Sequence, residues 1–158
     1  MPKQLKIIIF DGSFKTTTFV NRLIEGLVLK HEIYVLGFNE DLPQPIPGVK
    51  YVALGSNQSY LRLAAVSLVS AFKSKRIKVL ASTVKALGLK QRKSLQQQNL
   101  AQALKTIQPD IIHLQWLSNI SVFETYLKQG DYKFVLSQRG YHVNIRPFVD
   151  PDNMAYLK

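Results

Sequence analysis

The chain has 158 residues and no cysteine; 46% of its residues are hydrophobic and 20% are charged. This composition is typical of one globular domain and excludes a disordered segment, a disulfide framework and a thiolate metal site. No uncharged apolar run reaches the roughly 20 residues of a membrane-spanning helix, and the N-terminus lacks the pattern of a signal peptide. We therefore expect a cytoplasmic protein that at most rests on the inner face of a membrane.

The first part of the chain predicts a strand, a helix and a second strand. Leu5–Phe10 is a nearly continuous apolar run, as expected for a strand buried on both faces of a parallel sheet. After a break at Asp11–Ser13, apolar residues recur at helical spacing, and the hydroxyls of Thr16–Thr18 could cap that helix. His31–Leu36 follows as a strand. The predicted inward face of the helix comprises Phe19, Val20, Leu23, Ile24, Leu27 and Val28.

The middle of the chain predicts a third strand and a series of helices. The proline-rich loop Asp41–Gly48 precedes the strand Val49–Leu54. Helical spacing extends from Tyr60 to about Leu89, with a bend expected at Lys73–Lys78. Its predicted inward residues are Leu61, Ala64, Ala65, Leu68, Val69 and Phe72, then Ile77, Leu80, Val84 and Leu87. A further helix, Leu95–Gln108, is predicted to bury Leu100, Leu104 and Ile107.

The last part predicts two more strands, Asp110–Gln115 and Lys133–Ser137. Between them, Ser121 and Glu124 have the spacing of a capping box and predict a helix that ends near Gln129. The alternation of strands and helices predicts an α/β fold, with a Rossmann-like, doubly wound and mostly parallel sheet flanked by helices. We expect residues 1–158 to form a single domain.

Ligands of such sheets bind beyond the carboxyl ends of the strands. Three loops qualify here, Asp11–Thr16, Gln115–Asn119 and Gln138–His142, and all three are rich in hydrogen-bonding groups. Together with nearby aromatic rings they suit a polyhydroxylated ligand such as a sugar. The predicted ligand-contacting residues are Gly12, Ser13, Lys15, His113, Trp116, Gln138, Arg139, Gly140 and His142.

Other interpretations of these residues stay open. Lys15–Thr18 is similar to the end of a P-loop, but Phe14 stands where the second glycine belongs, and no GxGxxG pattern is present. His113 and Trp116 could equally belong to the core. Arg139 either contacts a ligand or forms a structural ion pair, because an unpaired buried guanidinium costs several kcal/mol. We expect no metal site, since no ligand set has suitable spacing.

Basic residues gather in one segment. The stretch from Leu42 to Pro109 holds no Asp or Glu but 11 Lys and Arg, whereas the remaining residues carry 10 basic and 10 acidic side chains. We expect the basic segment, residues 50–93, to meet either an anionic membrane surface, where each cation contributes roughly 1 kcal/mol, or another domain of the same protein. A solvated basic face is the remaining alternative. No nucleic-acid-binding motif is present, so we expect no specific nucleic-acid partner.

Several motifs, in their order and spacing, resemble one family. They are the opening KIIIF, the "GHEV"-like Lys30–Ile33, the "PDIIH" strand Pro109–His113 and the turn Val135–Gly140. This pattern resembles the N-terminal domain of retaining GT-B glycosyltransferases of the bacterial group-1 type, over nearly the whole chain. Many members of that family carry a His at the turn where Arg139 stands here.

The resemblance implies half of a two-domain enzyme that moves a sugar from a nucleotide-sugar to a saccharide or lipid-linked acceptor with retention of configuration. This half would hold the acceptor, as in polysaccharide biosynthesis. The nucleotide-sugar would bind a C-terminal domain absent from this chain, so we expect no cofactor here and no activity from this fragment alone. Arg139 is the candidate catalytic residue; it is not a base, but it could hold a phosphate or acidic sugar. The alternative is a free-standing Rossmann-like binding or regulatory module.

Overall fold

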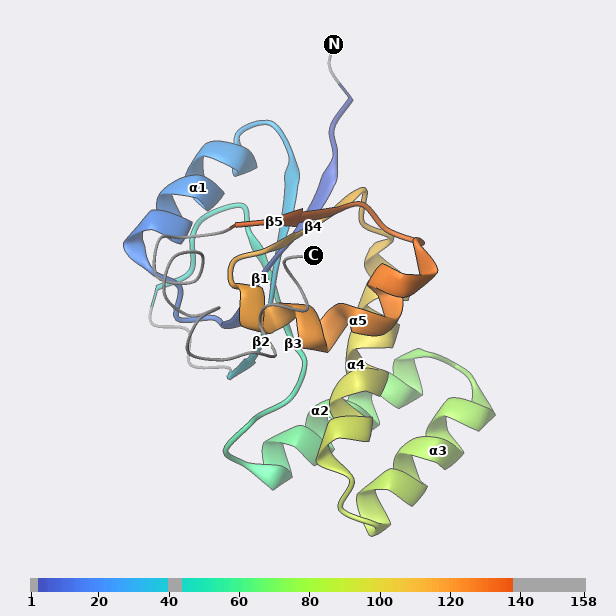
Figure 1. Cartoon of the computed structure of the whole chain (residues 1–158). Helices are drawn as coiled ribbons and strands as arrows, with labels where there is room; N and C mark the ends of the chain where they lie inside the picture. The colour runs from blue at the N-terminus through green and yellow to red at the C-terminus, as the bar shows by residue number, and fades with distance from the viewer. Residues whose placement is uncertain (1–2, 40–43, 138–158) are drawn as a thin grey trace, which may run out of the picture.

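Five strands form one parallel sheet in the order β3-β2-β1-β4-β5, with helices on both faces (Figure 1). The computed structural model describes residues 3–39 and 44–137. The predicted α/β, Rossmann-like class is confirmed. The elements are β1 (Lys6–Ser13), α1 (Thr18–Val28), β2 (Glu32–Asn39), β3 (Lys50–Ala53), α2 (Tyr60–Lys73), α3 (Ile77–Gly88), α4 (Arg92–Ile107), β4 (Ile111–Leu114), the 3-10 turn η1 (Leu117–Asn119), α5 (Ile120–Gln129) and β5 (Phe134–Leu136).

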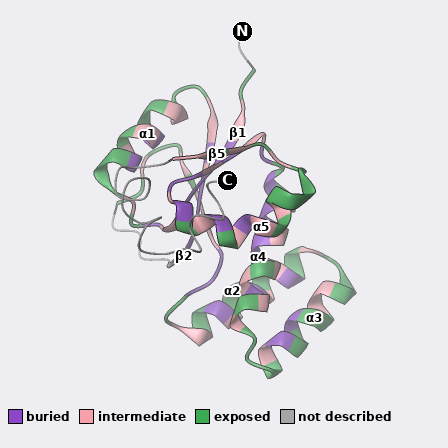
Figure 2. Cartoon of the chain, viewed as in Figure 1, coloured by how far each residue is buried: buried purple, intermediate pink, exposed green. Residues whose placement is uncertain are grey.

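The continuous apolar run of β1 is explained by burial on both faces of the sheet. Because side chains alternate along a strand, Ile9 packs with Ile24 of α1, whereas Phe10 packs with residues of α4 and α5. The Phe10 ring makes edge-to-face contacts with Phe38 and Phe123, at centroid distances of 5.8 and 4.9 Å. Figure 2 shows this buried layer along the strands. The sheet and its helices α1, α4 and α5 are called the sheet layer below.

Helices α2 and α3 pack on α4 and on each other, and they extend away from the sheet (Figure 1). The predicted bend between them is confirmed. Their contact has a small core of its own, formed by Leu63, Ala86 and Leu95. Residues 60–88 are called the hairpin below. Among the described residues no helix is long and apolar enough to cross a membrane.

The predicted inward face of the hairpin is wrong. Leu61, Phe72 and Ile77 are 82%, 66% and 86% exposed, and Val69 and Val84 are also exposed. The residues that are buried instead are Leu63, Ser67, Ala71, Thr83 and Ala86. Ala65 is exposed as well, and Ala64, Leu68, Leu80 and Leu87 are half-buried. The physical reason is that the hairpin packs through Leu63 and a row of small side chains, which permit close helix contact, so most of the bulky apolar stripe stays exposed.

Two local predictions about α1 also fail. On α1, Phe19 is 61% exposed, because Val20 and Ile24 provide the contact with the sheet. Thr17 is the N-cap of α1, but no side chain caps the helix; the Thr16 hydroxyl instead bonds the side chain of Asn21.

The predicted capping box is wrong as well. Helix α5 begins at Ile120, directly after the 3-10 turn, so Ser121 lies inside its first turn rather than at the cap. The Ser121 hydroxyl donates to the carbonyl of Ser118 at 3.1 Å. Glu124 pairs with Lys128 one turn later at 2.7 Å.

Candidate functional site

The carboxyl end of β1 is irregular. Asp11–Ser13, predicted to break the strand, instead continues β1, and its pairing with β2 shifts register on both sides of Gly12. Gly12 has a φ of +79°, a conformation that side chains rarely adopt. Opposite it, a Cβ on Gly37 would lie 2.9 Å from the carbonyl carbon of Ser13. Two facing glycines therefore let the strand bulge and redirect the chain toward the adjacent loop.

The loops after β1 and β4 converge at this edge, as predicted. The indole N–H of Trp116 donates to the carboxylate of Asp11. The Asn119 side chain donates to the carbonyl of Phe10 at 3.3 Å, and its oxygen lies 3.7 Å from the position of a Cβ on Gly12. The backbone N–H of Gln115 also donates to Phe10, at 3.0 Å. Two segments more than 100 residues apart thus form one polar surface beside a half-buried indole.

The other predicted residues of these loops have smaller parts. The Ser13 hydroxyl accepts the backbone N–H of Lys15 at 3.0 Å and so stabilises the turn, and Lys15 itself is exposed. His113 is half-buried in β4, and its Nε2 lies 2.8 Å from the hydroxyl of Ser137. This contact ties β4 to the end of β5, next to the start of the third predicted loop.

The third predicted loop lies outside the described residues. Its members Gln138, Arg139, Gly140 and His142 therefore stay predictions, including Arg139 as the candidate catalytic residue. The backbone N–H of Ser137 donates to Leu114 at 2.9 Å, so β5 ends beside β4 at the same edge. Within the described ranges, no group of three or more His, Asp or Glu side chains could hold a metal ion.

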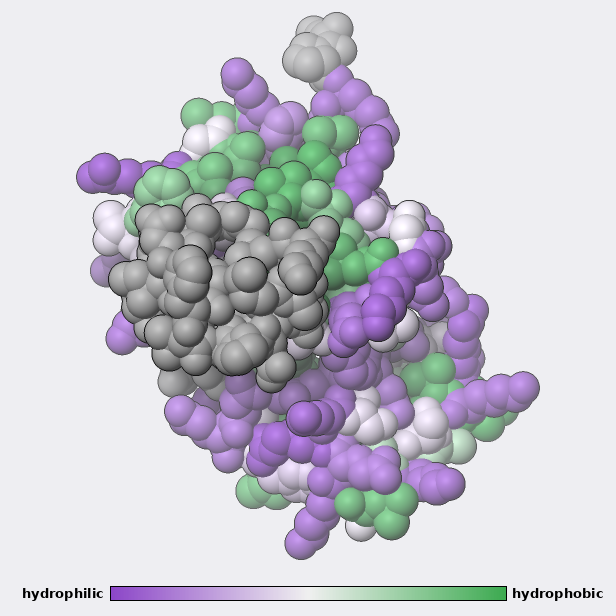
Figure 3. All heavy atoms as spheres, in the orientation of Figure 1, coloured by the Kyte–Doolittle hydropathy of each residue, from purple (hydrophilic) through white to green (hydrophobic). Residues whose placement is uncertain are grey.

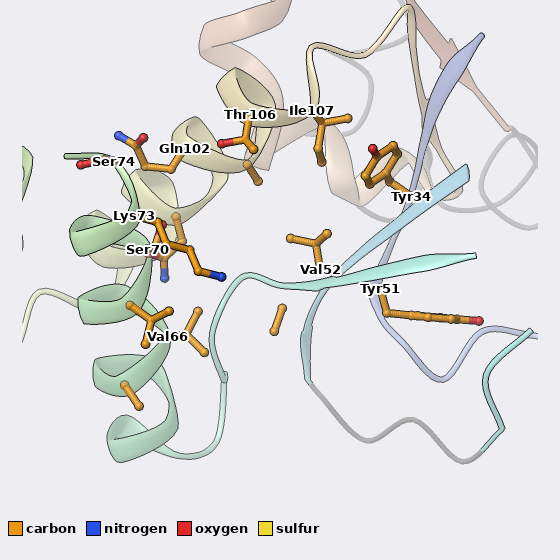
Figure 4. Close-up of a pocket in the computed structure, with 15 residues that line it drawn as sticks. Tyr34, Tyr51, Val52, Val66, Ser70, Lys73, Ser74, Gln102, Thr106 and Ile107 are labelled. Carbon is orange, nitrogen blue, oxygen red and sulfur yellow. The ribbon is translucent and has the colours of Figure 1, made fainter. Parts of the chain in front are cut away.

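A cavity of about 570 Å³ lies elsewhere, between β3, α2 and α4 (Figure 4). It is on the far side of the sheet from α1, at the edge strand, and no sequence pattern predicted it. It exists because α2 rests on α4 rather than on the sheet, which leaves β3 uncovered on that side. The only sequence signal for this cavity that we identify is the small size of Ala65, Ser70 and Ala103, whose side chains leave the space unfilled.

A second unpredicted feature is the exposed surface of the hairpin, where hydrophobic and hydrophilic residues lie beside one another (Figure 3). We call it the hairpin face. Its exposed apolar members are Leu61, Phe72, Ile77, Val84 and the adjacent Leu89, and its exposed basic members are Lys75, Arg76, Lys78 and Lys85. No acidic residue occurs in this part of the sequence.

Comparisons of the chain with protein-family models, curated proteins and solved structures find no match.

Proposed function

We propose that this chain is the acceptor-side domain of a retaining GT-B glycosyltransferase. The observation that carries the proposal is the contact of Asp11 with Trp116 at the carboxyl ends of β1 and β4. In the strand order 3-2-1-4-5, chain connections run in opposite directions from these two strands, and open α/β sheets bind ligands at this switch point.

The chemistry of this edge suits a sugar. The Asp11 carboxylate orients the indole of Trp116, whose ring can pack on the apolar face of a pyranose. Asn119 and Ser13 add an amide and a hydroxyl within the same loops, and such groups donate to and accept from sugar hydroxyls. A nucleotide-sugar donor would bind a second domain, and the sugar would pass across the cleft between the two with its anomeric configuration retained.

The single tryptophan of the chain permits a direct binding test. Titration with a panel of disaccharides, and with a prenyl-phosphate-linked sugar in detergent, should change the Trp116 fluorescence saturably. Asn119→Ala should weaken the best ligand about tenfold, because a hydrogen bond to the sugar is lost. Asn57→Ala, which removes the same side chain from an exposed loop, is the matched control. Ligands that leave the fluorescence unchanged, or equal binding by Asn119→Ala, would contradict the proposal.

Arg139 is tested in the full-length enzyme. Arg139→Ala should raise the acceptor KM or lower turnover at least tenfold, equivalent to about 1.4 kcal/mol, because a guanidinium that holds an acidic acceptor group has no neutral replacement. Unchanged kinetics would remove Arg139 from the site.

The hairpin face favours a second function, reversible attachment to an anionic membrane. Interfacial helices combine exposed apolar side chains, which enter the headgroup region, with Lys and Arg that pair with acidic lipids. Each cation near such a surface contributes about 1 kcal/mol. A second copy of this chain would bring like charges together. A nucleic acid would leave the apolar members of the face, such as Ile77, in water.

Vesicle sedimentation tests this attachment. The chain should bind vesicles that contain phosphatidylglycerol and bind neutral phosphatidylcholine vesicles much more weakly. Leu61→Ser should weaken binding about tenfold, since a leucine side chain no longer enters the membrane. Leu29→Ser is a matched control, because Leu29 at the end of α1 is equally exposed, at 82%, but lies outside the hairpin. Equal binding to both vesicles, or to neither, would refute the attachment.

A further inference from the structure

We propose that the cavity between β3, α2 and α4 binds the hydrocarbon chain of an acidic amphiphile and that Lys73 holds the acidic group. The acidic group is a carboxylate or a phosphate monoester. This site lies apart from the carboxyl edge of the sheet, so the inference goes beyond the acceptor-binding function and does not depend on it.

Part of the cavity lining is apolar. Val52 contributes from the edge strand, Val66 and Val69 from α2, and Ala103 and Ile107 from α4. A volume of about 570 Å³ lies within the range of small-molecule sites, which are mostly apolar with a few polar groups. Burial of a hydrocarbon chain against these walls would remove apolar surface from water on both sides of the contact.

Asn99 of α4 forms a hydrogen-bonded bridge to the segment after β3 and to α2, the elements that surround the cavity. The buried side chain of Asn99 donates to the carbonyl of Leu54 at 3.1 Å and to the hydroxyl of Ser67 at 2.9 Å. These bonds fix the segment after β3 to α2 at a set spacing. The cavity is therefore a defined part of the fold, because a buried hydrogen-bond network connects the elements that form it.

The polar lining gathers toward the end of α2. Lys73, Ser70 and Ser74 come from that end, and Gln102 and Thr106 come from the facing part of α4 (Figure 4). The Lys73 side chain reaches into the gap between α2 and β3 in this view. The cavity thus has an apolar part and a cationic part, as an amphiphile with one charged end requires.

The charge of Lys73 is not balanced by a carboxylate of the described residues. The sequence holds no acid between Leu42 and Pro109, and Lys73 takes part in none of the ion pairs formed within the described residues. Tyr34, which also lines the cavity, donates its hydroxyl to Glu32 at 2.7 Å, and Glu32 is further bonded to Lys50. An anionic ligand would therefore complement Lys73 without displacing a carboxylate of residues 3–39 or 44–137.

Titration calorimetry with monomeric fatty acids tests the site. Along the series octanoate, decanoate, dodecanoate and tetradecanoate, each added methylene should tighten binding about threefold to fourfold until the chain fills the cavity. Dodecanol should bind roughly threefold to tenfold more weakly than dodecanoate, because it lacks the charge. Dodecyl phosphate and a lysophosphatidylglycerol, run beside dodecanoate, distinguish a free acid from a lipid headgroup as the source of the anion.

Two matched pairs of variants locate the binding. Lys73→Gln should remove the preference for dodecanoate over dodecanol, whereas Lys78→Gln on α3 should keep it. Ala65→Phe should fill part of the cavity and reduce affinity at least tenfold, whereas Ala81→Phe, the same change at an exposed position of α3, should not. Both alanines are exposed on helices, so both variants should fold, which thermal unfolding checks.

Other results would overturn the site. Affinity that does not depend on chain length, or dodecanoate binding unchanged in a folded Ala65→Phe variant, would show that the cavity takes no hydrocarbon chain. Leu61→Ser should leave the binding of monomeric dodecanoate unchanged, and a loss there would assign the binding to the hairpin face instead. Saccharide titration of Trp116 gives an independent signal, so failure of the acceptor proposal would not affect this outcome.

Discussion

The sheet layer and the hairpin use their apolar residues in opposite ways. In the sheet layer, apolar periodicity coincides with burial: Ile24 of α1 and Phe10 of β1 are fully buried. In the hairpin, the apolar stripe that includes Leu61 and Phe72 is exposed, and α2 instead buries Leu63 together with small residues such as Ala71. Periodicity therefore shows that a helix has an apolar face, but the neighbouring elements decide which face they cover. For the hairpin, the described part of the chain leaves that face open.

The largest difference in stability between the two regions should appear when one phenylalanine in each is replaced by alanine. Phe10→Ala removes a fully buried ring that contacts two others and should cost about 3–5 kcal/mol of unfolding free energy. Phe72→Ala, the same change on the hairpin face, should alter stability by less than about 0.5 kcal/mol. Urea unfolding of both variants measures the difference. A cost above 2 kcal/mol for Phe72→Ala would mean that this face is covered within the folded chain.

A substitution in the segment that connects the two regions should lower stability by nearly as much. Gly55, between β3 and α2, has a φ of +107°, and a Cβ there would lie 2.3 Å from Cδ1 of Leu63. Gly55→Ala should therefore cost about 2–4 kcal/mol through backbone strain and overpacking. Gly26→Ala, within α1 and with open space around the added methyl, should instead stabilise by about 0.4–1 kcal/mol. Thermal unfolding that shifts in the same direction for both variants would contradict this account.

The Asn99 bridge should have a smaller but distinct effect. Asn99→Ala leaves the buried carbonyl of Leu54 and hydroxyl of Ser67 without their donor and should cost about 1–3 kcal/mol. Gln96→Ala on the same helix removes an exposed bond to Asn57 and should change stability by less than about 0.5 kcal/mol. Hydrogen exchange adds the regional comparison: α2 should lose more protection than β1 in Asn99→Ala. Equal loss throughout would mean that the two regions unfold as one unit.

Most of the fold could be predicted because strands and helices are local patterns. The five strands, the bend near Lys73 and the buried face of α4 all follow from spacing along the chain. The caps could not be predicted, because a helix that begins only two residues earlier, with Asn119 as its N-cap, places Ser121 inside the first turn. The inward face of the hairpin could not be predicted either, since it depends on how closely α2 approaches α4.

The candidate site, like the fold, has features that could be predicted from the sequence and features that could not. Parallel topology was enough to bring the loops of Asp11 and Trp116 to one edge, since strands that run together end together. The β1 bulge was not visible in the sequence, because it needs Gly12 and Gly37 to face one another across two strands. The cavity was missed because it arises from the distance between α2 and β3, which no sequence pattern contains.

The smallest expected difference between the two regions is their response to acid. The hairpin contains no carboxylate, so only the sheet layer has carboxylates that can take up protons. In the sheet layer, the Asp110 carboxylate accepts the backbone N–H of Lys6 at 2.9 Å and pairs with Lys3 at 3.0 Å, and these contacts lower the pKa of Asp110. Hydrogen bonds from Lys50 and Tyr34 likewise lower the pKa of Glu32. Both groups therefore stabilise the fold above their unfolded pKa values, and this contribution is lost as the pH falls through the folded values.

The pH dependence of Asp110→Asn measures this contribution. Between about pH 5 and pH 2, the decline in stability should be shallower in Asp110→Asn than in the wild type, because one carboxylate no longer takes up a proton on unfolding. Asp131→Asn removes the same charge from an exposed position before β5 and serves as the control for the loss of the charge itself. Urea midpoints at several pH values supply the measurement. An unchanged slope in Asp110→Asn would mean that the link between the N-terminal strand and β4 is already broken in acid, before the rest of the sheet layer unfolds.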